Sequence, residues 1–342
     1  MPRPARIPMA FATVAACFTM SCGPLVTEPM PDIPQTVEYE TVRIEYGTGD
    51  GLQEMNNAHL QRTMIVGDSS ELAAFTLQTV AGTNRILYDH FQLIDNIKVH
   101  PPSSHEDGVW NWEAHLESGY FHFRIEEQDT DTYTYSLRGG RSSQDNREYF
   151  SGRFTAFEHL GDRQQGFGTV RFDFDAIRHY DASSQAWGKV AIAFRANNGV
   201  RQVRVGFDQA LFDAGNEPLN ALYEYVQFPN QRGHLIFFGR ADFTGDGVQE
   251  FLGVNANWTA DRAGRVAGEV SGAALAQPIR VEQCWNEQSI VVYAHSTPTL
   301  PDYDGGEFSD CAAELQDLEI EPPLYDPPDG EEPEVPGPHP AE

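Results

Sequence analysis

The chain contains almost no lysine, few cysteines and no long apolar run beyond its N-terminus. Only Lys98 and Lys189 are lysines, and in total 23 basic side chains stand against 51 acidic ones, which gives a net charge of −28. Non-specific affinity for nucleic acid comes from neutralising phosphates, and a chain this acidic cannot supply it. The composition therefore predicts that nucleic acid is not a partner.

The sequence also lacks the short motifs of common enzyme classes. It has no HExxH or HxH pattern, no serine in a GxSxG turn and no CxxC pair. One pair of carboxylates keeps an envelope hydrolase open as an alternative. Asp173 and Asp175 alternate in FDFD, which we expect to be a strand, so both would lie on one face and could divide acid and base roles. We favour a protein with no catalytic residues.

The N-terminus is typical of an export signal. Arg3 and Arg6 precede a short apolar run, Ile7–Met20, and small residues lead to Cys22. The run Thr19–Cys22 resembles the lipobox of bacterial lipoproteins, in which the peptide is cut before the cysteine. This resemblance implies a signal peptide over residues 1–21 and lipidation of Cys22, which would anchor the protein to the outer membrane. An ordinary secretory peptide with an incidental Cys22 is the alternative.

Composition divides the remainder of the chain into three parts. Residues 22–35 are rich in proline and predict a tether, and residues 36–315 predict a single domain. The segment 316–342 is acidic, rich in proline and poor in apolar residues, which is typical of disorder. In an exported chain, Cys284 and Cys311 remain as one pair, and we expect them to form a disulfide.

Apolar residues recur at helical spacing before the chain reaches Pro101 and Pro102. We expect Thr36–Gly47 to form a short strand and Leu52–Lys98 to be helical. Ser69 or Ser70 can cap the helical region, Gly82 should divide it into two helices, and the two prolines should end it.

After the prolines the period changes from helical to two. Twelve alternating segments follow, from VWNWEAHL at residue 109 to QSIVVYAHS at residue 288, separated by clusters of Gly, Asn, Asp and Ser. No helix between them is long enough for a parallel crossover. The sequence therefore predicts an α+β fold dominated by β-structure. We expect an antiparallel meander of about a dozen strands that forms a barrel or a curved half-barrel, packed by the N-terminal helices.

The order of several diffuse motifs resembles a family. After the lipobox and the helical region come PPS at residue 101, the tryptophans Trp110 and Trp112, FDFDAI, a TGDG turn, NWTADRAGRVAGEVSG and QCWN. This order is similar to a group of uncharacterised secreted lipoproteins common in myxobacteria and their relatives. The resemblance implies the localisation and the architecture above, and it supplies no catalytic residues.

The stretch ADFTGDGVQEFLG is similar to a calcium loop. Acidic side chains recur at alternate positions of such loops and a glycine permits the sharp turn. A hairpin turn in which Gly and Asp simply tolerate positive φ is the alternative. The candidate ligands of a structural calcium ion are Asp242, Thr244, Asp246, Val248 and Glu250.

Aromatic residues follow the predicted strands. A concave apolar face of this kind could hold a lipid or another hydrophobic small molecule. The alternative is that these rings form the core beneath the helices. The candidate ligand-binding residues are Trp110, Trp112, Phe121, Phe123, Tyr133, Tyr135, Phe172 and Phe174.

These features together predict a non-enzymatic lipoprotein of the cell envelope. It would bind or carry a hydrophobic ligand, or scaffold an envelope protein at the outer membrane. The alternatives are the hydrolase and a calcium-stabilised surface adhesion module.

Overall fold

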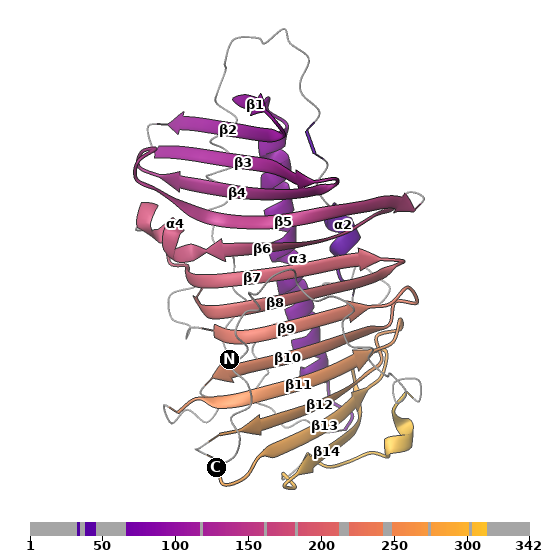
Figure 1. Cartoon of the computed structure of the whole chain (residues 1–342). Helices are drawn as coiled ribbons and strands as arrows, with labels where there is room; N and C mark the ends of the chain where they lie inside the picture. The colour runs from indigo at the N-terminus through magenta and orange to yellow at the C-terminus, as the bar shows by residue number, and fades with distance from the viewer. Residues whose placement is uncertain are drawn as a thin grey trace.

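In the computed structural model, one antiparallel sheet contains most of the described residues. The structure describes residues 33–34, 38–45, 66–116, 119–160, 163–181, 184–211, 219–241, 248–272, 275–300 and 303–312. Fourteen strands follow one another in sequence order from β1 to β14, each hydrogen-bonded to the next. The sheet is curved and open, since its first and last strands pair only with their sequence neighbours (Figure 1). The predicted fold class is confirmed, with a half-barrel in place of a closed barrel.

The strands are three to fifteen residues long. They are β1 (Ser104–Glu106), β2 (Val109–Leu116), β3 (Gly119–Asp129), β4 (Thr132–Gly140), β5 (Asn146–Leu160), β6 (Arg163–Asp173), β7 (Trp187–Asn197), β8 (Val200–Leu211), β9 (Leu219–Gln227), β10 (Gly233–Ala241), β11 (Glu250–Trp258), β12 (Gly264–Ser271), β13 (Ile279–Trp285) and β14 (Val291–Thr297).

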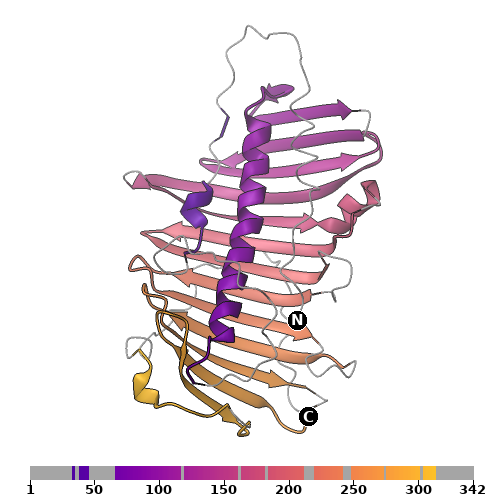
Figure 2. The same ribbon diagram turned by 180° about the vertical axis from the view of Figure 1, so that it is seen from behind.

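One long helix, α3 (Glu71–Lys98), crosses one face of the sheet (Figure 2). Its N-terminal end lies at β13, where the Ser70 hydroxyl donates to the Gln283 side chain. At the far end, Trp112 on β2 donates to the carbonyl of His100 at 2.8 Å. A helix of 28 residues is about 42 Å long, close to the width of ten strands at about 4.8 Å each. The helix thus runs from β13 toward β2, which is opposite to the sequence order of the strands.

Local sequence sets the limits of α3. Ser70 caps its N-terminus by accepting from the Ala73 amide at 3.0 Å, and the helix ends three residues before Pro101. The prediction that Gly82 divides the region into two helices is wrong. Gly82 lies on the exposed side of a continuous helix, between the buried Val80 and Thr83. Glycine costs about 1 kcal/mol in a helix, and burial of the apolar stripe on either side offsets this cost.

The expected strand at Thr36–Gly47 is also not formed. The described part of this segment contains a single helical turn, α2 (Tyr39–Val42). Ile44 exchanges two backbone hydrogen bonds with the side-chain amide of Asn84 on α3, at 3.0 and 2.7 Å. The alternation of apolar residues here reflects packing against α3 and its neighbouring strands, and no strand pairing accompanies it in the described residues.

Both edges of the sheet are partly covered. β1 is a short, exposed strand of three residues, and it pairs with Val109–Asn111 of β2. At the other edge, Ala294 of β14 exchanges both backbone hydrogen bonds with Gly305 at 2.9 Å. Sequence patterns missed β1 and β13, because the first is very short and the second is buried unevenly along its length.

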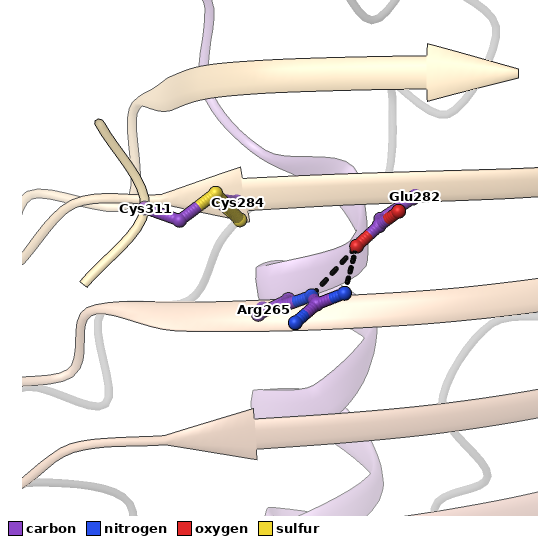
Figure 3. Close-up of a disulfide and its surroundings, with 4 residues drawn as sticks. All are labelled: Arg265, Glu282, Cys284 and Cys311. Carbon is purple, nitrogen blue, oxygen red and sulfur yellow. Dashed lines mark hydrogen bonds and ion pairs between the residues drawn. A yellow bond between two sulfur atoms is a disulfide. The ribbon is translucent and has the colours of Figure 1, made fainter. Parts of the chain in front are cut away.

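The expected disulfide joins Cys284 on β13 to Cys311, with Cα atoms 5.5 Å apart (Figure 3). Both side chains are buried. Arg265, the neighbour of Cys284 on β12, binds Glu282 and lies over the ring of Phe308 at 4.9 Å. The bridge therefore holds the chain end against the last three strands.

Reduction of this disulfide should lower the free energy of unfolding by about 3 kcal/mol, because a closed loop of this length restricts the unfolded chain. The Cys311→Ser variant should show the same loss in denaturant unfolding monitored by tryptophan fluorescence. Ser309→Ala, an exposed change two residues away, is the control and should leave the midpoint unchanged. Equal midpoints for oxidised and reduced protein would contradict this account.

Candidate functional site

The aromatic residues proposed to bind a ligand lie beneath α3. Trp112, Phe121 and Phe123 are each at most 2 % exposed, and Tyr133 is partly buried against the same cluster. The remaining four of the predicted set, Trp110, Tyr135, Phe172 and Phe174, are also buried in this core. Their packing favours the core alternative over a hollow ligand site.

His90 of α3 lies in the middle of this core. Its Nε2 atom is 3.0 Å from the Tyr135 hydroxyl on β4, and that hydroxyl lies 3.3 Å from the Thr169 carbonyl on β6. Since a carbonyl can only accept, we assign the proton of Tyr135 to that bond and the Nε2–H tautomer to His90. The rings of Phe91, Phe150 and Phe172 pack around the imidazole at 5.1–5.4 Å between centroids.

Burial lowers the pKa of His90 from 6.5 to about 3. The same desolvation raises the pKa of Tyr135 well above its ordinary value. His90 is therefore neutral at physiological pH, and Nδ1 has no hydrogen-bond partner in the core. No substrate could reach this pair without displacing α3, so we regard it as a structural pair that fixes the helix on the sheet.

His90 should make the protein sensitive to acid. Its folded pKa is below its unfolded pKa, so its contribution is complete above about pH 6.5 and is lost as pH falls toward 3. Between pH 7 and pH 5 this loss should be about 2 kcal/mol, because only the unfolded chain takes up the proton. The stability difference between wild type and His90→Leu should therefore shift by that amount in urea unfolding at the two pH values.

Tyr135→Phe is the control for this measurement, because it changes the same contact but keeps the imidazole. It should lose stability on acidification as the wild type does. If His90→Leu shows the same pH dependence as Tyr135→Phe, the imidazole is not the source of the acid sensitivity.

The histidines of the first hairpin lie on the opposite face of the sheet. The register places His115 opposite Tyr120 and His122 opposite Glu113, so the two histidines do not face each other across this hairpin. His122 bonds the Asn111 side chain at 2.9 Å, and burial together with the nearby Glu113 carboxylate raises the pKa of Tyr120. Burial lowers the pKa of His122, so the imidazole is neutral. These bonds pair no nucleophile with an imidazole base.

The paired carboxylates proposed for a hydrolase are not on one strand face, so that prediction is wrong. Asp173 ends β6 and caps a short helix, α4 (Phe174–Tyr180), by accepting from the Ala176 amide at 3.0 Å. Asp175 lies in the first turn of α4 and accepts from the Gly188 amide at 3.2 Å. Aspartate is a favoured N-cap residue, and this local preference overrides the alternating pattern.

The proposed calcium loop connects β10 to β11, which confirms its position at the tip of a hairpin. Asp242, Thr244 and Asp246 fall outside the described residues. Val248 is exposed, and Glu250 is fully buried at the start of β11. In the described parts of the chain, no group of three His, Cys, Asp or Glu side chains could hold a metal ion. Calcium at this loop stays a prediction.

The face of the sheet opposite α3, which we call the open face, carries regular rows of side chains across many strands. Because registers are maintained from strand to strand, outward residues line up. One row runs Ser136, Ser151, Arg171, Ala191 and Gly206 from β4 to β8. The next row runs Thr134, Arg153, Thr169, Ala193 and Arg204, and Arg195 lies opposite Phe167 and Gln202.

Arg153, Arg171 and Arg195 form what we call the basic patch. Ion pairs mark its two sides: Arg124 binds Glu126 at 2.8 Å on β3, and Arg204 of β8 binds Glu224 at 3.3 Å. Between these pairs the two rows contain hydroxyl, small and basic side chains and no carboxylate.

Two of the three arginines in the basic patch lack an acidic partner. No ion pair is formed by Arg153 or Arg195 with any described residue, and the Nε atom of Arg153 is buried without a hydrogen-bond partner. In a chain with a net charge of −28, unopposed arginines on one surface are an unusual concentration of positive charge. The surface is suited to bind carboxylates, because guanidinium groups bind them in a bidentate geometry.

Sequence analysis missed this patch, although a signal was present. Arginine recurs at outward positions of each strand from β3 to β8, but charged residues there are normally solvated, and alternation alone does not give the register. Only the register places the arginines of β5, β6 and β7 on one face of three adjacent strands, where Arg153 lies opposite Thr169, two residues from Arg171, and Arg195 lies four residues along β7 from Ala191, the residue opposite Arg171.

The remaining predicted sites are not placed by the structure. Cys22 and the export signal lie outside the described residues, and no helix in the described part of the chain is long and apolar enough to cross a membrane. Comparisons of the chain with protein families, curated proteins and solved structures found no match. The resemblance to secreted lipoproteins stays a prediction.

Proposed function

We propose that the protein is a non-enzymatic binding protein of the cell envelope that scaffolds an acidic partner on its open face. The basic patch is the observation that carries this proposal. Its arginines lie on neighbouring strands of a continuous sheet, so their backbone positions are held at fixed spacing before a partner binds.

The packing of α3 supports scaffolding over carriage of a hydrophobic ligand. The aromatic face that such a ligand would occupy already contacts the helix, with Phe75 against Phe237 and Phe91 against Phe194 at 5.4 and 5.5 Å between ring centroids. A ligand would have to displace these contacts. On the open face, by contrast, the described helices α2 and α3 cover none of the strands (Figures 1 and 2).

The proposal includes a lipid anchor at Cys22 and an outer-membrane location, both of which rest on the N-terminal sequence. Two acyl signals anchor stably, whereas one chain binds only marginally. Cys22→Ser should therefore move the protein from the membrane fraction to the soluble envelope fraction of its own cells. Cys17→Ser, a change inside the expected signal peptide, is the matched control and should leave the distribution unchanged. Membrane association of Cys22→Ser would remove the anchor from the proposal.

Binding of poly-L-glutamate, an acidic polypeptide probe, tests the open face. Replacing Arg153, Arg171 and Arg195 together by Gln should weaken binding about tenfold at low salt, because each exposed ion pair contributes about 0.5 kcal/mol. The measurement is fluorescence anisotropy of the labelled probe with the full chain.

A second triple variant, Arg85→Gln, Arg178→Gln and Arg280→Gln, controls for the change in net charge. These three arginines are exposed and lie outside the basic patch. They should change the affinity for the probe by less than about twofold. If the two triple variants bind equally, general charge and not the open face explains the binding.

A further inference from the structure

The C-terminal end of the described chain lies on the open face. Cys284 lies opposite Arg265 on β12 and Tyr293 on β14, both outward residues. The short helix η2 (Phe308–Asp310) packs there too, because Phe308 contacts Tyr293 edge-on at 5.4 Å and lies beneath Arg265 at 4.9 Å. The disulfide to Cys311 then fixes the point from which the following residues depart (Figure 3).

The residues that follow have the opposite charge to the basic patch. Segment 313–342, which we call the acidic segment, contains ten Asp or Glu residues and no Lys or Arg. Five of these acids lie close together, at Asp326, Asp329, Glu331, Glu332 and Glu334. Their density matches a surface on which arginines on neighbouring strands have no carboxylate between them.

The chain that follows Cys311 is long enough to reach from β13 to the basic patch. Seven strand spacings separate β13 from β6, which is about 34 Å at about 4.8 Å each. Glu331 comes 20 residues after Cys311. A flexible chain of that length spans about 25 Å on average, and a proline-rich extended one about 60 Å. Tethering at this range corresponds to a local concentration on the order of millimolar, sufficient for weak ion pairs to be populated.

We propose that the acidic segment docks on the basic patch of its own molecule and competes there with the acidic partner. Docking of the acidic segment does not depend on whether an external acidic partner exists. Only the competition with that partner rests on the proposed function. The tethered segment would keep the arginines covered until a partner of higher charge density displaces it.

Lys189 allows a direct test of docking. It is exposed on β7, two residues before Ala191, which lies opposite Arg171. The only other lysine, Lys98, is partly buried and donates to the Pro34 carbonyl. A carbodiimide joins amines to carboxylates without a spacer, so it should link Lys189 to residues 326–334 of the full chain. Peptide mass spectrometry should show these links fall about tenfold between about 0.01 M and 1 M salt, as the Debye length falls from about 30 to 3 Å.

Internal and variant controls accompany this experiment. Asp208 lies opposite Lys189 on β8, and a link between these two reports that the amine reacts normally. The Arg153, Arg171 and Arg195 triple Gln variant should lose most links to the acidic segment and keep the link to Asp208. The control triple variant at Arg85, Arg178 and Arg280 should keep both. Links that are absent, or that are insensitive to salt and to the patch variant, would overturn docking.

Mixing isotopically light and heavy protein identifies the occupant. Links within light or within heavy chains support docking on the same molecule, whereas mixed links would show that a second copy occupies the patch and would overturn the proposal.

Competition is measured separately with poly-L-glutamate. Changing the five clustered acids to Asn and Gln should tighten the binding of this probe about threefold or more at low salt. Docking with no change in probe affinity would contradict the competition alone. Failure of the probe to bind the patch at all would contradict the proposed function and leave docking intact.

Discussion

Burial of one stripe of α3 across successive strands is the contact on which the rest of the structure depends. The sheet is a single layer, and its apolar face would be open to water without a cover. One continuous helix contacts β10 through Phe75, β7 through Phe91, and β4, β5 and β6 through His90. Because consecutive strands contact consecutive turns of the helix, α3 joins strands that are distant in sequence. His90 and Tyr135 add a polar bond at the centre of this interface.

Covering one face with a helix has a consequence for the other. The aromatic side chains are buried in the core beneath α3, so the open face is the surface of the sheet that remains accessible to a partner. Its chemistry differs from the average of the chain. Overall the molecule is strongly acidic, yet the middle of this face presents arginine, serine and threonine. Such a local reversal of charge favours an acidic partner at short range, while the remainder of the surface repels acidic molecules that do not fit.

The disulfide connects this surface to the end of the chain. By holding Cys311 against β13, it fixes the last described residues on the open face and not at the edge beyond β14. The loop that it closes adds stability in the chain-entropy account, and the covalent bond also fixes the position of η2 beside Arg265 and Tyr293. Both effects follow from one covalent bond near the last strands.

Periodicity in the sequence determined twelve of the fourteen strands and the antiparallel meander, and local capping and proline signals determined the cap at Ser70 and the end of α3, because each depends on neighbouring residues. It also indicated the cysteine pair, since export leaves only Cys284 and Cys311. Only the tertiary structure decided that Gly82 lies within one helix and that Asp173 caps α4, because long-range burial and a local capping bond outweigh propensity and alternation. The basic patch could also be recognised only from the tertiary structure. Its arginines are separated by many residues in sequence, and strand register alone places them on the same face of three adjacent strands.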